Sequence, residues 1–117
     1  MWNESMDLAE ACYGLTRTFP KEEMYGMTSQ VRRSAAAIPA NIAEGYGREG
    51  PSEFVRFLRI AQGSLKELET HLILASRVGL TNHEETVPVL ERCETVGKMV
   101  RSLIRSIQAR KKNGSRE

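Results

Sequence analysis

Apolar residues recur every three or four positions over four stretches of the chain, and this spacing predicts four amphipathic helices. The clearest stretch has steps that alternate between four and three residues: Phe54, Leu58, Ala61, Leu65, Leu68, Leu72, Ala75 and Gly79. A mean step of about 3.5 residues is typical of helices that pack nearly parallel along an apolar seam. We expect helices at about 3–18, 21–46, 52–79 and 82–111.

Helix-breaking residues separate these four stretches. Pro20 ends the first, the segment from Gly45 to Pro51 ends the second, and Gly79 ends the third. The residues Thr81–Glu84 have the form of a capping box that opens the fourth helix. Short connections between four helices predict an all-α, antiparallel up-down-up-down four-helix bundle at residues 1–112, followed by a disordered basic tail at 113–117.

The second helix contains a proline in mid-sequence, but its apolar row keeps the same phase on both sides of Pro39. This continuity predicts one kinked helix with the apolar row Met24, Met27, Val31, Ala35, Ile38 and Ile42. A parallel row is unusually polar: Gln30, Arg33, Ala37, Asn41, Glu44 and Arg48. The alanines around Pro39 would let a neighbouring backbone come close.

Composition restricts the class of protein. The chain has 117 residues, enough for one domain, and only 6% aromatic residues, so we expect an aliphatic and alanine-based core. No apolar run approaches the ~18 residues of a membrane span, and the acidic N-terminal stretch fits no signal peptide. Cys12 and Cys93 lack metal or redox spacing, which favours two buried, reduced thiols and a cytoplasmic location.

The sequence contains few candidates for catalytic residues. His71 has Leu68 three residues before it, so the Glu-x-x-His pairs of di-iron bundles are missing. Arg77 and His83 have the R-x5-H spacing of HEPN-class ribonucleases, but they straddle the turn at Gly79. We therefore predict a non-enzymatic protein with no catalytic residues, no metal site and no cofactor.

The distribution of charge is more informative than the net charge of +2. The first helix is acidic and the end of the chain is basic, which suggests contact between copies or a polyanionic partner such as RNA or DNA. The candidate nucleic-acid contacts are eleven basic residues on the later helices: Arg32, Arg48, Arg56, Arg59, Lys66, Lys98, Arg101, Arg105, Arg110, Lys111 and Lys112.

Three segments, IPANIAEG, EFVRFL and GSLKELET, give the chain a family resemblance. It closely resembles the bacterial four-helix-bundle proteins encoded in intervening sequences of large-subunit (23S) ribosomal RNA genes. That family is similar to the accessory variability determinant of diversity-generating retroelements, a basic pentamer that works with a reverse transcriptase and its template RNA. The resemblance implies a cytoplasmic, non-enzymatic homopentamer that associates with RNA and that works with a reverse transcriptase in some cases.

The polar row of the second helix fits such an assembly. Arg33, Asn41 and Glu44 would form a buried hydrogen-bonded network at a bundle or subunit contact, and Glu67 and Glu69 would pair with arginines of a neighbouring copy. The alternative is an ordinary exposed row. At the level of function, the alternatives to a nucleic-acid scaffold are a protein–protein adaptor and, more remotely, a ribonuclease that uses Arg77 and His83.

Overall fold

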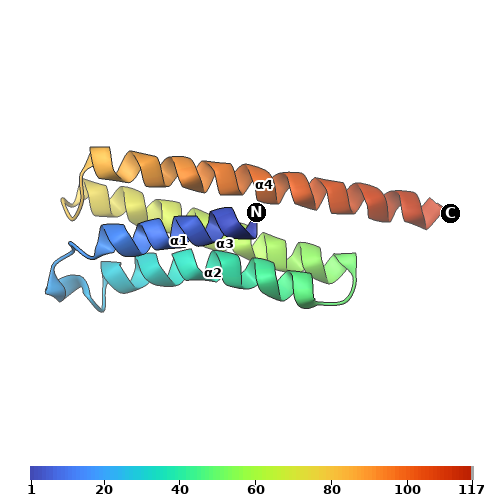
Figure 1. The fold of residues 1–117 in the computed structure, drawn as a ribbon, viewed down its shortest axis with the longest axis horizontal. Coiled ribbons are helices and arrows are strands. Elements are labelled where there is room, and N and C mark those ends of the chain that lie inside the picture. Colours follow the sequence, from blue (N-terminus) through green and yellow to red (C-terminus); the bar gives the residue numbers. More distant parts are fainter. Residues whose placement is uncertain (117) are drawn as a thin grey trace.

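The structure, a computed structural model, describes the backbone of residues 1–116 and the side chains of residues 1–111. It contains four α-helices: α1 (Trp2–Thr16), α2 (Met27–Gly47), α3 (Pro51–Arg77) and α4 (His83–Arg116). A 3-10 turn, η1 (Lys21–Glu23), lies between α1 and α2, and the described residues contain no strand. The chain turns back at each connection, so the helices lie lengthwise in one bundle (Figure 1). Each of α1 and α3 packs against both α2 and α4.

The core is aliphatic, as the composition predicts, and the seam of α3 supplies much of it. Leu58, Leu68 and Leu72 are completely buried. They pack with apolar residues of all three other helices, which include Leu8, Cys12, Val31, Ala35, Ile38, Cys93, Val96 and Val100. Burying a side chain of this kind contributes about 1.5–3 kcal/mol, so this seam carries much of the stability of the bundle.

Helix α2 runs through Pro39 without interruption, as its apolar phase predicts. Its C-terminal end lies very close to α3, because Gly45 is buried directly against Phe57 and Phe54. Gly50 adopts φ +87° in the short connection and lets the chain reverse into α3. The prediction of a stop between Gly45 and Pro51 is therefore confirmed.

The second helix begins at Met27, so the predicted start at residue 21 is wrong. After Pro20 the backbone makes successive three-residue turns, with the N–H of Met24 bonded to Lys21 O at 3.1 Å and the N–H of Gly26 bonded to Glu23 O at 3.0 Å. These turns end at Gly26, where the α-helical pattern starts. Met24 therefore lies outside the apolar row, with 53% of its surface exposed.

The other three helices also differ from their predicted ends. Helix α1 ends at Thr16 rather than 18, and α3 spans 51–77 rather than 52–79. Asn82, not Thr81, caps α4, because its Oδ1 accepts the N–H of Glu85 at 2.8 Å. Helix α4 continues to Arg116 in the structure, beyond the predicted end at residue 111, and disorder of the tail at 113–117 stays a prediction. Residues 108–112 have high helix propensity, which favours continuation of α4. Glu117, the last residue of the predicted tail, lies outside the described residues.

The helices have very different lengths. Helix α1 has 15 residues, against 27 in α3 and 34 in α4. The N-terminus consequently lies near the middle of the bundle, and α4 extends along its full length (Figure 1). Helix α4 therefore extends beyond the α2–α3 corner (Figure 1).

Candidate nucleic-acid interface

Among the predicted phosphate contacts, Arg32 has a structural role in joining two helices. Its Nε donates to Thr16 Oγ1 at 2.9 Å, and its guanidinium lies 4.7 Å from the centre of the Tyr13 ring. Both partners belong to α1, whereas Arg32 belongs to α2. The Arg32 guanidinium therefore joins α2 to α1 and is not directed toward a ligand.

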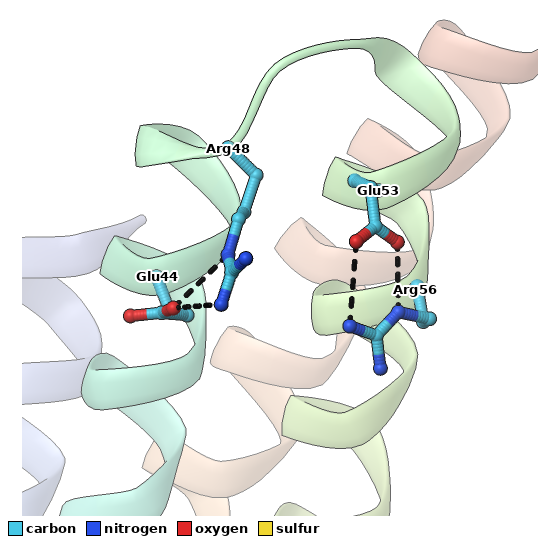
Figure 2. Close-up of polar contacts among 4 residues, drawn as sticks. All are labelled: Glu44, Arg48, Glu53 and Arg56. Carbon is cyan, nitrogen blue, oxygen red and sulfur yellow. Dashed lines mark hydrogen bonds and ion pairs between the residues drawn. The ribbon is translucent and has the colours of Figure 1, made fainter.

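Arg48 and Arg56 are paired with carboxylates at the α2–α3 corner. Figure 2 shows Arg48 directed to Glu44 and Arg56 directed to Glu53, with closest N···O distances of 2.7 and 2.8 Å. Both guanidiniums also lie over the ring of Phe57, at 5.3 and 4.5 Å. The hydrogen bond from Arg56 lowers the pKa of the Glu53 carboxyl and raises the pKa of Arg56 itself. These pairs cancel the local positive charge, so the corner is a weak phosphate site.

Two lysines are paired in the same way. Lys66 lies 3.3 Å from Glu69, and Lys98 lies 3.4 Å from Glu94, in each case on the same helix. Both lysine side chains remain about 70% exposed, at 72% and 68%. Exposed pairs of this kind contribute little free energy, so these lysines can exchange partners easily.

The remaining cations are concentrated on the second half of α4. Three exposed arginines make no ion pair within the described residues: Arg101 and Arg105 on α4, and Arg59 on α3. Arg110 donates to Ser106 Oγ at 3.1 Å, and the Lys111 ammonium contacts Ser52 Oγ at the start of α3. The side chain of Lys112 lies outside the described residues. No acidic residue occurs between Glu94 and Glu117, so this half of α4 is the most consistently basic surface of the protein.

A groove between α3 and α4, which we call the α3–α4 groove, lies beside this surface. It has a volume of about 550 Å³, and its apolar lining includes Ile73 and Leu90. Lys66 and Arg101 line one part, whereas Glu69, Glu91 and Glu94 line the rest. Arg59 lies two turns before Lys66 on the same side of α3. The charge of this face therefore changes sign along its length.

The described residues do not form the predicted polar network within one protomer. Arg33 is exposed, Asn41 Nδ2 donates to Ala37 O on its own helix at 2.8 Å, and Glu44 pairs with Arg48. Glu67 lies 3.4 Å from His71, and Glu69 is paired with Lys66. Asn41 and Glu44 each bond instead to a residue four positions away on α2, and no bond joins either of them to Arg33 within the described residues. A network at a contact between copies remains a prediction.

The residues considered for catalysis and metal binding are not brought together. Arg77 ends α3 and His83 begins α4; both are exposed, and no hydrogen bond joins them within the described chain. The described residues contain no group of three or more His, Cys, Asp or Glu side chains that could hold a metal ion. Across the same part of the chain, no helix is both long enough and apolar enough to cross a membrane.

A second groove, which the sequence pattern does not reveal, lies between α1 and α2. It has a volume of about 870 Å³ and is mostly apolar, with Trp2 and Tyr13 on one side and Ala36, Pro39 and Ala40 on the other. Trp2 and Tyr13 are partly exposed, at 46% and 41%. The spacing of Ala36, Ala40 and Ala43 was the available signal, but it indicated close packing rather than an open groove.

The described residues thus define an all-α bundle whose distinctive features are charged outer faces and open grooves. Residues 1–102 match the family model described as 23S rRNA-intervening sequence protein. The chain belongs to this family. A search of curated proteins found no significant match.

The fold is also similar to a solved structure, the 1.70 Å crystal structure of a protein of unknown function from the S23 ribosomal protein family of Bacteroides thetaiotaomicron. The two chains are 24% identical, and the TM-score is 0.79 over 88% of this chain and 96% of that chain. At this level of identity the similarity establishes the fold alone.

Proposed function

We propose that this protein is a non-enzymatic, cytoplasmic, homo-oligomeric bundle that associates with structured RNA through the second half of α4. The observation that carries the proposal is the run of basic residues from Lys98 to Lys111 without an intervening carboxylate. Lys98, Arg101 and Arg105 lie on one exposed side of the helix, where they can reach the phosphates of a duplex. Contacts of this kind are independent of sequence and depend strongly on salt.

Assembly would strengthen such binding. The family resemblance implies a homopentamer, and a ring of five copies would repeat the basic surface of α4 around its circumference. Because one bound copy holds its neighbours close to the same RNA, weak contacts from several copies add to a much tighter interaction. A role beside a reverse transcriptase belongs to the same proposal and is supported by the resemblance alone.

The experiment compares two pairs of arginines by RNA titration. A double variant of Arg101→Gln and Arg105→Gln should weaken binding to an RNA hairpin of about 16 base pairs. It should also reduce the salt slope, by about 0.7–0.9 for each lost phosphate contact. The matched control is the double variant of Arg48→Gln and Arg56→Gln, which should bind nearly as the natural chain does. Binding that is insensitive to salt, or equal loss in both variants, would contradict the proposal.

A second candidate function, that of a protein–protein adaptor, is favoured by the apolar α1–α2 groove. Partly exposed Trp2 and Tyr13 beside small residues form a surface that suits an apolar partner better than a phosphate backbone. A partner protein retained after nuclease treatment, and lost on Tyr13→Ala, would support the adaptor. A partner released by nuclease would instead support RNA association.

A further inference from the structure

A small pocket lies where the start of α3 meets the second half of α4. It has a volume of about 410 Å³, which is within the range of about 300–1,000 Å³ that is usual for small-molecule sites. We call it the end pocket, and six residues line it: Pro51, Phe54, Leu103, Ile107, Arg110 and Lys111. The first four are apolar, and the two cations follow Ile107 by one helical turn. The pocket therefore has an apolar part beside a basic part.

Aromatic rings extend the apolar part of the end pocket toward solvent. Phe54 lines the pocket, and the Tyr46 ring meets the Phe54 ring edge to face, with the ring centres 6.0 Å apart. Tyr46 lies near the C-terminal end of α2 and is 80% exposed, so most of its ring surface is open to solvent. Two aromatic rings, one from α2 and one from α3, thus come together beside the second half of α4.

The charge of the end pocket distinguishes it from the two larger grooves. Among the residues with described side chains, no carboxylate lines it, whereas Glu10 lines the α1–α2 groove and Glu69 lines the α3–α4 groove. Glu53, in the first turn of α3, is paired with Arg56 at 2.8 Å. Arg110 bonds to a serine hydroxyl and makes no ion pair within the described residues. The pocket therefore suits a ligand that combines an apolar face with negative charge.

The two cations of the pocket lie on a different side of α4 from the proposed duplex contacts. Helical geometry places Arg110 and Lys111 about 140° and about 120° around the axis from Arg105. Both line the pocket against α3, whereas Arg101 and Arg105 are on the exposed side. A duplex that contacts the exposed side does not reach into the pocket, but a flexible single strand beyond the duplex can turn into it.

We infer that the end pocket holds an unpaired nucleotide next to the RNA duplex. The base would stack against Phe54 and Tyr46, because every base has a π face that packs on aromatic rings. Its phosphate would contact Arg110 and Lys111. A base inside a duplex is already stacked and paired, so an overhang, a bulge or a loop must supply it. This inference rests on the proposed function and specifies its ligand as RNA with a single-stranded segment beside a duplex.

Fluorescence anisotropy with two RNAs tests the inference. One RNA is a blunt duplex of about 16 base pairs, and the other is the same duplex with a single-stranded overhang of about four nucleotides. The natural chain should bind the second RNA about fivefold more tightly, because a base stacks in the pocket. An overhang of abasic nucleotides keeps the phosphates but lacks the bases, so it should lose most of this gain. An equal gain from the abasic overhang would overturn the inference.

Substitution of the exposed ring tests the stacking contact. Tyr46→Ala should remove most of the gain from the overhang and leave binding of the blunt duplex unchanged, whereas Tyr46→Phe keeps the ring and should retain the gain. The matched control is Tyr25→Ala, because Tyr25 is 93% exposed and precedes α2, at the other end of that helix from Tyr46. All three variants should keep the circular dichroism of the natural chain. Equal losses in Tyr46→Ala and Tyr25→Ala would contradict the stacking contact.

Substitution of a cation tests the phosphate contact. Arg110→Gln should reduce the gain from the overhang and lower the salt slope for that RNA by about 0.7, the value for one single-strand phosphate contact. The blunt duplex should keep its salt slope. Arg92→Gln is the matched control, because Arg92 is exposed near the start of α4 and its loss changes the net charge equally. If Arg110→Gln weakened binding of both RNAs by the same factor, the pocket would not be a separate site.

The inference and the proposed function fail in different ways. The double variant of Arg101→Gln and Arg105→Gln should weaken binding of both RNAs by the same factor and leave the gain unchanged. If the blunt duplex does not bind, but a single strand of about ten nucleotides binds and loses affinity on Tyr46→Ala, duplex association fails and the pocket stands. If duplex binding depends on these two arginines and the overhang adds nothing, the pocket fails and the proposed function stands.

A free nucleotide has the same chemistry as an unpaired nucleotide of RNA, and titration with adenosine monophosphate separates the two sources. Because no duplex holds it near the pocket, adenosine monophosphate should bind at least about 100-fold more weakly than the RNA with the overhang. Binding of adenosine monophosphate as tight as that of this RNA would overturn the assignment of the pocket to RNA.

Discussion

Gly45 of α2 lies directly against Phe57 of α3, and a methyl group added to Gly45 would stand only 2.7 Å from Phe57 Cβ. The backbone O of Phe54 would be 3.3 Å from the same methyl group. Neither atom is the end of a flexible side chain, so the two helices would have to move apart. This close approach holds α2 against α3 at the corner where Arg48 and Arg56 stack on Phe57.

We therefore predict that Gly45→Ala destabilises the protein by about 1–3 kcal/mol, the usual effect of overpacking. The matched control is Gly63→Ala, because Gly63 is an exposed position of α3 with no atom within 4 Å of the added methyl group. Because alanine has a higher helix propensity than glycine, Gly63→Ala should stabilise the protein by up to about 1 kcal/mol. Urea unfolding followed by circular dichroism measures both. Equal effects of the two substitutions would contradict the close contact.

The apolar seam of α3 gives a second prediction. Leu65 is 3% exposed, and Leu65→Ala should lower the free energy of unfolding by about 2–5 kcal/mol, because it leaves a cavity. Ile60 on the same helix is 40% exposed, so Ile60→Ala should cost much less. An equal loss in the free energy of unfolding for Ile60→Ala and Leu65→Ala, measured in the same experiment, would contradict this prediction.

Arg32 and Arg33 are adjacent but should behave differently. Arg32→Ala removes a hydrogen bond to Thr16 and the contact with Tyr13, so a loss of about 1–2 kcal/mol is expected. Arg33 is exposed and makes no hydrogen bond or ion pair within the described residues, so Arg33→Ala should leave the melting temperature of the protomer almost unchanged. A larger loss for Arg33→Ala that grows with protein concentration would instead indicate a contact between copies.

The two thiols predict a dependence of stability on pH. Burial raises the pKa of Cys12 and of Cys93 to about 12, and for Cys93 the nearby Cys12 and Glu69 add to the effect. Below the ordinary thiol pKa both states are protonated and stability is unaffected. Above it, only the unfolded chain loses these protons, so the free energy of unfolding should fall as pH rises from about 9 towards 12.

Unfolding in urea at several alkaline pH values measures this loss, which cannot exceed about 1.4 kcal/mol per thiol for each pH unit. The control is a variant with both cysteines replaced by alanine, which should lose less stability over the same interval. If the natural chain and this variant responded equally to pH, the thiols would not be the cause.

The sequence predicted α3 well because its period continues unbroken from Phe54 to Ala75, and each position of the row points to the core. It failed at the start of α2 because Met24 satisfies the same period while lying in a turn. Gly26 was the signal against a continuous helix. Periodicity alone cannot distinguish a residue inside a helix from an apolar residue outside it that has the same spacing by chance.

The candidate interface was predicted less well, for two different reasons. The pairing of Arg48 with Glu44 and of Arg56 with Glu53 follows a spacing of three or four residues, so it could have been read from the sequence. The contact of Arg32 with Thr16 joins two helices and depends on how they are aligned, which no local pattern specifies. Consequently Arg48 and Arg56 could have been excluded as phosphate contacts from the sequence alone, but Arg32 could not.

The burial of both native cysteines has a practical consequence for studying this protein. A thiol with a pKa near 12 is almost fully protonated at neutral pH, and the core shields it from reagents. A cysteine introduced at the exposed position Ser102 would therefore accept a maleimide dye or a spin label selectively in the folded chain. Spectroscopic distances between labels on α4 could then be measured without first removing Cys12 or Cys93.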